Sequence, residues 1–202
     1  MPRLLAAVYD TLMKSTEKGC LAEWRSELLA SLSGAVLEVG AGTGANLAHY
    51  PAAVSRLVLA EPDPAMRRRL AGRIGQRGEI IDSPAEKLPF RDRTFDAVVC
   101  TLVLCSARDP AAALSEMHRV LKLGGSLRFI EHVAAADSSG RLKWQRRIEP
   151  LWKRLMGNCH VTRRTEEAIG AAGFTLIEVK RESLRKAIPI VRPTIRGVAI
   201  RS

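Results

Sequence analysis

The sequence predicts an α/β protein with a doubly wound, mostly parallel seven-stranded sheet and an antiparallel C-terminal hairpin. Short apolar segments alternate with segments of helical periodicity through most of the chain, which is typical of parallel sheets covered by helices. The last two strand-like segments have no helix between them, which favours antiparallel pairing at the sheet edge. With 202 residues, 47% of them hydrophobic, the chain has the size and apolar content of one domain.

The N-terminal elements follow from apolar spacing and from glycine and proline. Residues 4–32 place apolar side chains three or four positions apart, which predicts a helix, and Gly19 is expected to divide it in two. The apolar strand 35–39 then ends in a glycine loop. A further helix is expected from about Asn46 until Pro51 stops it.

The middle of the chain repeats the alternation. Strand 57–60 is closed by the sequence EPDP, helix 65–74 follows, and 79–81 is a weak third strand. Residues 97–104 are almost continuously apolar, as expected of a strand buried on both faces.

Helix 110–121, with Asp109 as its cap, is expected to end at Gly124 and Gly125, before strand 127–130.

The pattern changes after the fifth strand. An amphipathic basic stretch at 141–156 is interrupted by Pro150, and 162–172 reads as another helix. The last two strands are expected at 175–179 and 194–200. The basic stretch has three interpretations: a lid over a substrate, a helix on an anionic membrane, or a helix packed on the sheet.

Charge and apolar content restrict the class of protein. The chain has 32 basic and 21 acidic residues, a formal net charge of +11, which favours an acidic partner. The basic residues are spread along the chain rather than gathered in one patch, which argues against nucleic acid. No apolar run reaches the roughly 18 residues of a membrane-spanning helix, and charges near the start make a poor signal peptide. We therefore expect a cytoplasmic protein or one that rests peripherally on an anionic membrane.

The four cysteines form no CxxC pair, so no metal site is expected. Cys100 and Cys105 lie in or beside an apolar strand, where buried, inert thiols are usual. Cys159 and His160 form an adjacent pair that suits a local site better than a metal clamp.

The sequence VLEVGAGTG at 36–44 carries the most chemical information. Glycines after a first strand let the backbone approach a ligand closely. The loop also satisfies a dinucleotide fingerprint, with Glu61 about 20 residues further on. Glu38 argues against a pyrophosphate, because a carboxylate there suits a cationic ligand or anchors the loop. S-adenosylmethionine has no phosphate, carries a sulfonium, and offers Glu61 a ribose diol.

Several motifs together carry a family resemblance. VLEVGAGTG, the acid Glu61, AEKLPFRDRTFDAVVC and RVLKLGG resemble class I S-adenosylmethionine-dependent methyltransferases, which have a Rossmann-like fold. GANLAHYP, VVCTLVLCS, EHVA, EPLWKR and GNCHVTRRT are similar to the methyltransferase-like alkyl-thiol methyltransferases, whose mammalian members are membrane-associated. This resemblance runs from about Glu38 to Arg201. It implies S-adenosylmethionine as cofactor, S-adenosylhomocysteine as product and a small thiol as acceptor.

The resemblance also implies roles for residues. The methionine part of the cofactor would be surrounded by Glu38, Gly40, Gly42 and Gly44, and the ribose bound by Glu61, with Pro62 beside the adenine. The adenine edge would be formed by Ser83, Ala85 and Glu86, and the pocket floor by Thr101, Leu102 and the residues up to Leu104. Pro84 stands where many members have an aspartate, so the adenine contact would come from backbone groups or Glu86.

The domain organisation expected from these motifs is a helical cap at 1–33 and a Rossmann-like methyltransferase domain at 34–202. A helical, lid-like insertion is expected within it, at about 137–160.

Two histidines are candidate bases for the acceptor. His132 follows the fifth strand, at the sheet edge where ligands bind, and is the better candidate; His160 is a weaker one. A thiol with a pKa near ~8.5 needs little help to ionise. Residues 101–104 lack the Asn/Asp-Pro-Pro-aromatic run of enzymes that methylate amino groups of nucleic acids, which favours a small, apolar acceptor.

Alternatives remain open at this point. They are O- or N-methylation of another small or lipid-like molecule, a nicotinamide-dependent oxidoreductase, and a basic nucleic-acid-binding module. The sequence carries no signal for the oligomeric state.

Overall fold

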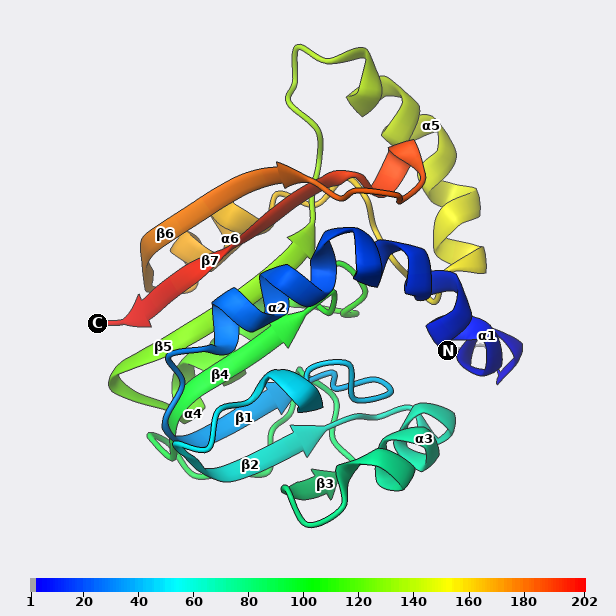
Figure 1. Cartoon of the computed structure of the whole chain (residues 1–202). Helices are drawn as coiled ribbons and strands as arrows, with labels where there is room; N and C mark the ends of the chain where they lie inside the picture. The colour runs from blue at the N-terminus through cyan, green and yellow to red at the C-terminus, as the bar shows by residue number, and fades with distance from the viewer. Residues whose placement is uncertain (1–2) are drawn as a thin grey trace.

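The computed structural model describes residues 3–202, with side chains from residue 9 onward, and its sheet has the order β3-β2-β1-β4-β5-β7-β6. The strands of this described part are β1 (Gly34–Val39), β2 (Val54–Ala60), β3 (Glu79–Ile81), β4 (Phe95–Thr101), β5 (Leu121–His132), β6 (Phe174–Ser183) and β7 (Pro193–Arg201). β1 to β5 run parallel, whereas β7 is antiparallel to both β5 and β6 (Figure 1). The predicted fold class is confirmed, including the antiparallel hairpin.

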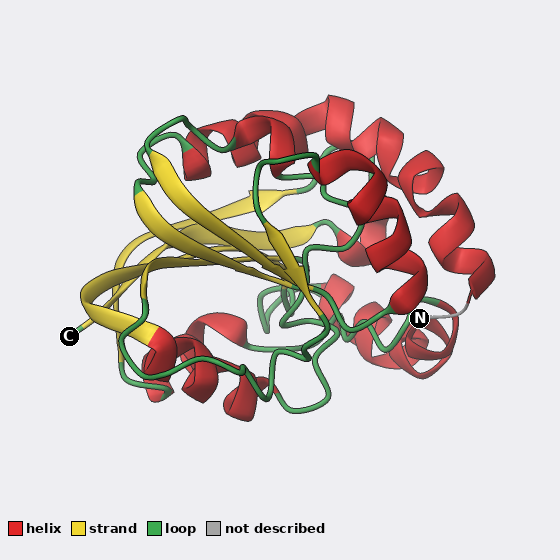
Figure 2. Cartoon of the chain, turned by 90° about the horizontal axis from the view of Figure 1, so that it is seen from below, coloured by secondary structure: helices red, strands yellow, loops and turns green. Residues whose placement is uncertain are grey.

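Helices cover both faces of the sheet (Figure 2). They are α1 (Arg3–Thr16), α2 (Ala22–Leu29), α3 (Pro64–Ile74), α4 (Pro110–Val120), α5 (Gly140–Leu155) and α6 (Thr165–Ala171). Successive strand residues face opposite sides of the sheet, so each buried strand feeds two cores. On β1, Leu37 and Val39 belong to the core that includes α4 and α6, whereas Val36 belongs to the core that includes α2 and α3.

The N-terminal segment forms two α-helices that are divided around Gly19, as expected. The division is a π-helical turn, η1 (Glu17–Leu21), which joins α1 to α2 without a loop. Gly19 also permits close packing, because a Cβ atom there would lie 3.1 Å from the carbonyl oxygen of Arg185.

Two expectations near the glycine loop are wrong. The helix expected from Asn46 is only a 3-10 turn, η2 (Leu47–His49). The fourth strand ends at Thr101 rather than at residue 104, because Leu102 has a left-handed backbone with φ of 60° that breaks the strand.

The region around α4 differs from the expectation in the residue at which β5 begins. Asp109 caps α4 as predicted, since its Oδ1 accepts the N–H groups of Ala111 and Ala112, each at 3.0 Å. The helix ends at Val120, and β5 begins at the next residue, so Gly124 and Gly125 lie within the strand rather than before it.

The later helices also depart from expectation. α5 continues through Pro150, whose missing N–H removes one hydrogen bond from a helix of 16 residues. α6 begins at Thr165 instead of residue 162, because Thr162 and Arg163 hydrogen-bond to other segments as a loop. A short 3-10 turn, η3 (Pro189–Val191), links β6 to β7, where no helix was expected.

The parallel strands all end at one edge of the sheet. In Figure 1 their arrowheads point toward the side on which α1, α3 and α5 lie. Ligands of open parallel sheets bind at the carboxyl ends of the strands, so this edge positions the candidate site.

Candidate active site

The loop after β1 has a backbone that only glycine adopts readily. Gly40, Gly42 and Gly44 have φ values of 65°, 58° and 87°. A Cβ atom on Gly40 would lie 2.6 Å from Cγ2 of Val103, so the loop also packs closely against the segment after β4. The backbone of this loop can therefore lie close to a ligand without intervening side chains, although the N–H groups of Gly40 and Gly44 donate to the carbonyl oxygens of Ala60 and Ala41.

Glu38 anchors this region from the end of β1. It is 1% exposed, and its two carboxylate oxygens accept hydrogen bonds from Asn46 Nδ2 at 2.9 Å and Tyr50 Oη at 2.7 Å. Burial raises its pKa to about 7, although both hydrogen bonds oppose the shift. Of the two roles that the sequence left open for Glu38, the geometry matches anchoring of the loop.

An arginine from the N-terminal helices completes this network. Arg25 on α2 is buried and donates from Nη1 to Asn46 Oδ1 at 2.7 Å and to Thr101 Oγ1 at 2.9 Å. Its other guanidinium nitrogens donate to Glu17 at 3.0 and 3.3 Å. Thr101, predicted to floor the pocket, is thus tied to α2 through its hydroxyl.

α1 is held against the glycine loop by Asp10. The Asp10 carboxylate accepts a hydrogen bond from Thr43 Oγ1 at 2.6 Å and forms an ion pair with Arg73 on α3. These interactions hold the pKa of Asp10 below its usual range, against the opposing effect of burial. The N-terminal helices therefore close over the loop that the sequence assigns to the cofactor.

Glu61 lies just beyond the end of β2 and is turned toward the glycine loop. It is 6% exposed; Oε2 accepts the Gly42 N–H at 2.7 Å and Oε1 accepts the Asp63 N–H at 2.8 Å. Burial raises its pKa, while both backbone hydrogen bonds lower it. Pro62 is exposed beside it. The carboxylate is thus fixed in orientation before any ligand arrives.

In the segment after β3, the polar side chains hydrogen-bond to the backbone of the protein itself. Ser83 is buried and its hydroxyl donates to the Lys87 carbonyl at 2.6 Å, and Ala85 packs into the core. The Glu86 carboxylate accepts the N–H groups of Arg108 and Asp109 at 2.8 and 3.2 Å. Glu86 therefore joins this segment to the start of α4, and backbone groups are left as the candidates for an adenine contact.

The β4–α4 loop is held by hydrogen bonds to two side chains, those of Glu131 and Arg163. Glu131, fully buried at the end of β5, accepts the N–H groups of Val103, Leu104 and Cys105 at 2.9 to 3.1 Å. Arg163 donates to the carbonyl oxygens of Leu104 and Ala107. Burial raises the pKa of Glu131 to about 7, against the effect of its three backbone bonds. The sequence singled out Glu131 only within EHVA, beside His132, and Arg163 only as part of the motif GNCHVTRRT.

His132 follows Glu131 and is 8% exposed. It hydrogen-bonds the backbone of Val191, and its Nδ1 atom has no hydrogen-bond partner. Burial lowers its pKa to about 4, so the imidazole is neutral at neutral pH. The ring can accept a hydrogen bond at Nδ1, but it is a weak base.

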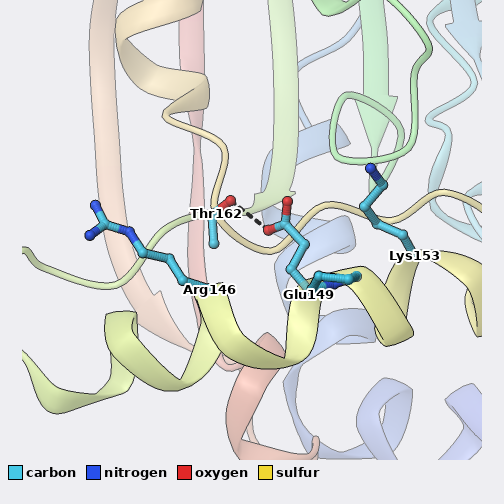
Figure 3. A pocket seen from close by; sticks show the side chains of 5 residues that line it. Arg146, Glu149, Lys153 and Thr162 are labelled. Carbon is cyan, nitrogen blue, oxygen red and sulfur yellow. Dashed lines mark hydrogen bonds between the residues drawn. The ribbon is translucent and has the colours of Figure 1, made fainter.

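His160 belongs to a different arrangement, beside α5. Its Nδ1 lies 3.0 Å from Oε1 of Glu149, whose other oxygen accepts the Thr162 hydroxyl (Figure 3). Glu149 and Thr162, with Arg146, Pro150 and Lys153, line a polar pocket of about 240 Å³ that none of the predicted cofactor residues borders. Burial and Arg163 lower the pKa of His160, although Glu149 raises it.

Comparisons with a family model and with curated proteins identify the family. A family model described as a methyltransferase domain matches residues 37–129. Rat thiol S-methyltransferase TMT1B is 37% identical over 173 residues, 82% of this chain and 70% of that protein. Human thiol S-methyltransferase TMT1A is 32% identical over 200 residues, 96% of this chain and 82% of that protein. The chain belongs to the class I S-adenosylmethionine-dependent methyltransferases.

A solved structure agrees with this methyltransferase fold. A SAM-dependent methyltransferase from Thermotoga maritima superposes with a TM-score of 0.74, covering 99% of this chain and 97% of that chain at 19% identity. At that identity the likeness concerns the fold alone. Family membership decides against the nicotinamide-dependent alternative, which shared the glycine loop.

The residues present fit the cofactor. The glycine loop leaves room for a ligand beside its backbone, and a buried carboxylate at the end of β2, oriented by two N–H groups, suits a ribose diol. When bound, S-adenosylmethionine supplies an electrophilic methyl group on a sulfonium. No cluster of three His, Cys, Asp or Glu side chains that could hold a metal occurs among the residues that the structure describes.

Around the glycine loop, sequence reasoning missed three residues: Arg25, Asn46 and Tyr50. Asn46 and Tyr50 lie inside GANLAHYP, so the motif contained the signal without indicating the contact to Glu38. Arg25 gave no signal, because an arginine on an amphipathic helix is usually exposed.

Proposed function

We propose that this methyltransferase transfers the methyl group of S-adenosylmethionine to the thiol of a small molecule. The observation that carries the proposal is the 32–37% identity to the TMT1 thiol S-methyltransferases over most of the chain. Several motifs that resemble the alkyl-thiol enzymes lie at the ends of β4 and β5 and after α5. In this proposal they surround the acceptor.

The chemistry of the site favours a thiol over an alcohol or an ammonium. Methyl transfer from a sulfonium is an in-line displacement, in which the protein aligns donor and acceptor and excludes water. The candidate base, His132, has a pKa of about 4 and takes up a proton poorly. A thiol is partly ionised without a strong base, whereas a hydroxyl is not. In this proposal His132 Nδ1 accepts a hydrogen bond from the acceptor, and His160 stays a weaker candidate.

The proposed cofactor contacts keep the positions that the family resemblance implies. Glu61 binds the ribose hydroxyls, with Pro62 beside the adenine. The methionine part is enclosed by the glycine loop and Glu38. Ser83, Ala85 and Glu86 lie at the adenine edge, and Thr101 with Leu102 forms the floor. The internal hydrogen bonds of Ser83 and Glu86 support a shaping role for these two side chains.

A matched set of acceptors tests the thiol. Benzyl mercaptan, benzyl alcohol and benzylamine share one carbon skeleton and differ only in the nucleophile. We expect mass spectrometry to detect a cofactor-dependent methyl thioether, with little methyl ether or methylamine. Methylation of the alcohol or the amine at rates equal to or above that of the thiol would contradict the proposal. Reactions without the protein control for uncatalysed methylation.

We also propose that the segment 1–33 caps the cofactor and that the insertion at about 137–160 covers the acceptor. Support comes from Asp10 on α1, and from Gln145 on α5. Gln145 is fully buried and bonds the backbone of Ala135, Val133 and Ile190, which fixes α5 above the end of β5.

The outer face of α5 supports a peripheral contact with an anionic membrane. Trp144, Leu151 and Leu155 lie on one helical stripe and are 66%, 61% and 57% exposed. The flanking residues Lys143, Arg147 and Arg154 are also exposed. Within residues 3–202, no helix combines the length and the apolar character needed to cross a bilayer. Contact through this stripe would be interfacial.

Vesicle sedimentation tests this contact. We expect the protein to sediment with vesicles containing phosphatidylserine and not with phosphatidylcholine alone, and a Trp144→Ser, Leu151→Ser double variant to lose most of the binding. Ile177→Ser on β6, where the side chain is also 61% exposed, is the matched control. Equal binding of the double variant and the wild type would rule out the α5 stripe.

A further inference from the structure

Two of the cysteines meet at the ligand-binding edge of the sheet. Cys105 follows the pocket floor in the β4–α4 loop, and Cys159 lies in the loop between α5 and α6. Both are free thiols and belong to one small buried cluster, with Cys105 1% exposed and Cys159 8% exposed. The sequence suggested an inert thiol at Cys105 and a local site at Cys159 and His160, but it did not indicate that the two cysteines are neighbours.

The backbone aligns the two cysteines. The N–H of His160 donates to the carbonyl oxygen of Cys105 at 2.7 Å, and Asn158 Nδ2 donates to the carbonyl oxygen of Ser106 at 3.0 Å. Cys159 therefore sits between two residues that both bond to the Cys105–Ser106 segment. Two cysteines on adjacent, hydrogen-bonded segments satisfy the first requirement of a disulfide, which is proximity without a large backbone movement.

The surroundings make the two thiols unequal. The interaction between them is the largest cause of both pKa shifts, and it lowers the pKa of Cys159 while it raises that of Cys105. The charged groups nearby are Arg163, which favours a thiolate, and Glu131, which opposes one. The hydroxyl of Tyr9 also faces the pair, and burial raises its pKa to about 12, so it stays neutral. Cys159 is the outer thiol of the pair, at 8% exposed against 1% for Cys105.

We propose that Cys105 and Cys159 form a dithiol site that reacts with small disulfides and closes to an intramolecular disulfide. The choice of small disulfides rests on the proposed thiol acceptor, whose oxidised form they are. The Cys159 thiolate attacks one sulfur of the small disulfide, forming a mixed disulfide and releasing one small thiolate. Cys105 then attacks Sγ of Cys159 and releases the second. The pair loses two electrons, the small disulfide gains them, and the two thiol protons leave on the released thiols.

The product would tie the floor of the cofactor pocket to the loop after α5. Glu131 and Arg163 already hold the Cys105 segment by hydrogen bonds, and the disulfide would add a covalent link across the acceptor side. Exchange of this kind suits a reducing compartment, where protein disulfides are transient and reversible.

The experiment uses the full chain, fully reduced and freed of reductant, with 2-hydroxyethyl disulfide and no methyl donor. We expect intact-mass spectrometry to show the loss of two hydrogen atoms, peptide mapping to place a single link between Cys105 and Cys159, and dithiothreitol to reverse it. In Cys105→Ser, the mixed disulfide should accumulate on Cys159. Cys20→Ser is the matched control, because Cys20 is also buried and only accepts the Arg185 N–H; it should behave as the wild type.

Three outcomes would overturn the inference: a wild type that stays fully reduced, a mixed disulfide on Cys159 that never resolves, or a link that involves Cys20 or Cys100. The assay contains no S-adenosylmethionine, so its failure is separate from failure of the proposed methyl transfer. A chain that methylates benzyl mercaptan but forms no link contradicts only this inference.

Discussion

Glu61 shows how a single carboxylate can be prepared for a ligand. Its two oxygens are held by the N–H groups of Gly42 and Asp63, so it couples the glycine loop to the end of β2. We expect Glu61→Ala to weaken S-adenosylmethionine binding about 10- to 100-fold, because hydrogen bonds to a charged group contribute roughly 1.5–3 kcal/mol. Isothermal titration measures it, with Glu79→Ala, an exposed partner of Arg56, as the control. Unchanged affinity in Glu61→Ala would remove Glu61 from the ribose site.

His132 is expected to act on the acceptor rather than on the cofactor. His132→Ala should lower kcat by roughly tenfold, at or below the low end of proton-transfer contributions, because the ring is a weak base. The affinity for S-adenosylmethionine should stay within about twofold, since Nδ1 bonds to no residue of the cofactor loop. Steady-state kinetics together with titration separates the two effects. Loss of cofactor binding with an intact fold would instead make His132 a structural residue of that loop.

The pH dependence of the rate follows from the same residue. With a pKa of about 4, His132 does not titrate between pH 5 and 9. At limiting acceptor, the rate should therefore rise with the thiolate fraction, and the midpoint should move to lower pH for a more acidic thiol. Rate profiles for two thiols of different pKa measure this. A midpoint fixed near pH 7 for both would point to Glu38 or Glu131, whose pKa values are about 7.

At the scale of elements, the contact between α1 and the glycine loop depends on few side chains. Asp10 bonds Thr43 and pairs with Arg73, and the side chains of Arg73 and Asp10 are 47% and 32% exposed. We expect Asp10→Ala to speed dissociation of S-adenosylmethionine several-fold and to change the free energy of unfolding by less than about 1 kcal/mol. Stopped-flow displacement measures the first and urea denaturation the second.

The matched control is Asp137→Ala, which removes an exposed ion pair with Arg164 away from the loop. It should leave the dissociation rate unchanged. An Asp10→Ala rate equal to that of the control would show that α1 does not gate the cofactor.

The elements that the sequence predicted well are those with strong local patterns. The strands 35–39 and 79–81 and the Asp109 cap depend on apolar runs and on side chains near in sequence. The misassigned elements depend on contacts distant in sequence. Asn46, for example, leaves its expected helix because its side chain hydrogen-bonds to Glu38 and Arg25. The site residues follow the same rule. Sequence motifs located Glu61, whereas the contacts of Arg25, Glu131 and Arg163 with the loops of the site depend on the fold.

At the scale of the whole molecule, Glu131 links stability to pH. Its pKa in the folded protein, about 7, lies above the ordinary value of 4.5, so its contribution to stability is full below pH 4.5 and is lost as the pH rises through 7. Glu131→Gln cannot ionise, but one of the three N–H groups loses its acceptor. We expect the wild type to be more stable than this variant by on the order of 1–3 kcal/mol at pH 5, and the difference to shrink toward pH 8.

Urea denaturation at several pH values measures this difference. Glu178→Gln, which removes an exposed pair with Lys180, should show a small difference without the same trend. A gap between the wild type and Glu131→Gln that widens with pH would mean that the carboxylate is favoured in its charged form by its three N–H donors.

The place of β7 in the sheet has a consequence for biosynthesis. β7 is inserted between β5 and β6, although β6 precedes it in the chain. While a ribosome is still making β7, the long β5 has an open edge and β6 has no neighbour to pair with. The nascent chain can therefore assemble the parallel strands early, but the sheet is complete only after β7 has left the exit tunnel. Until then the open edge of β5 can pair with a wrong strand.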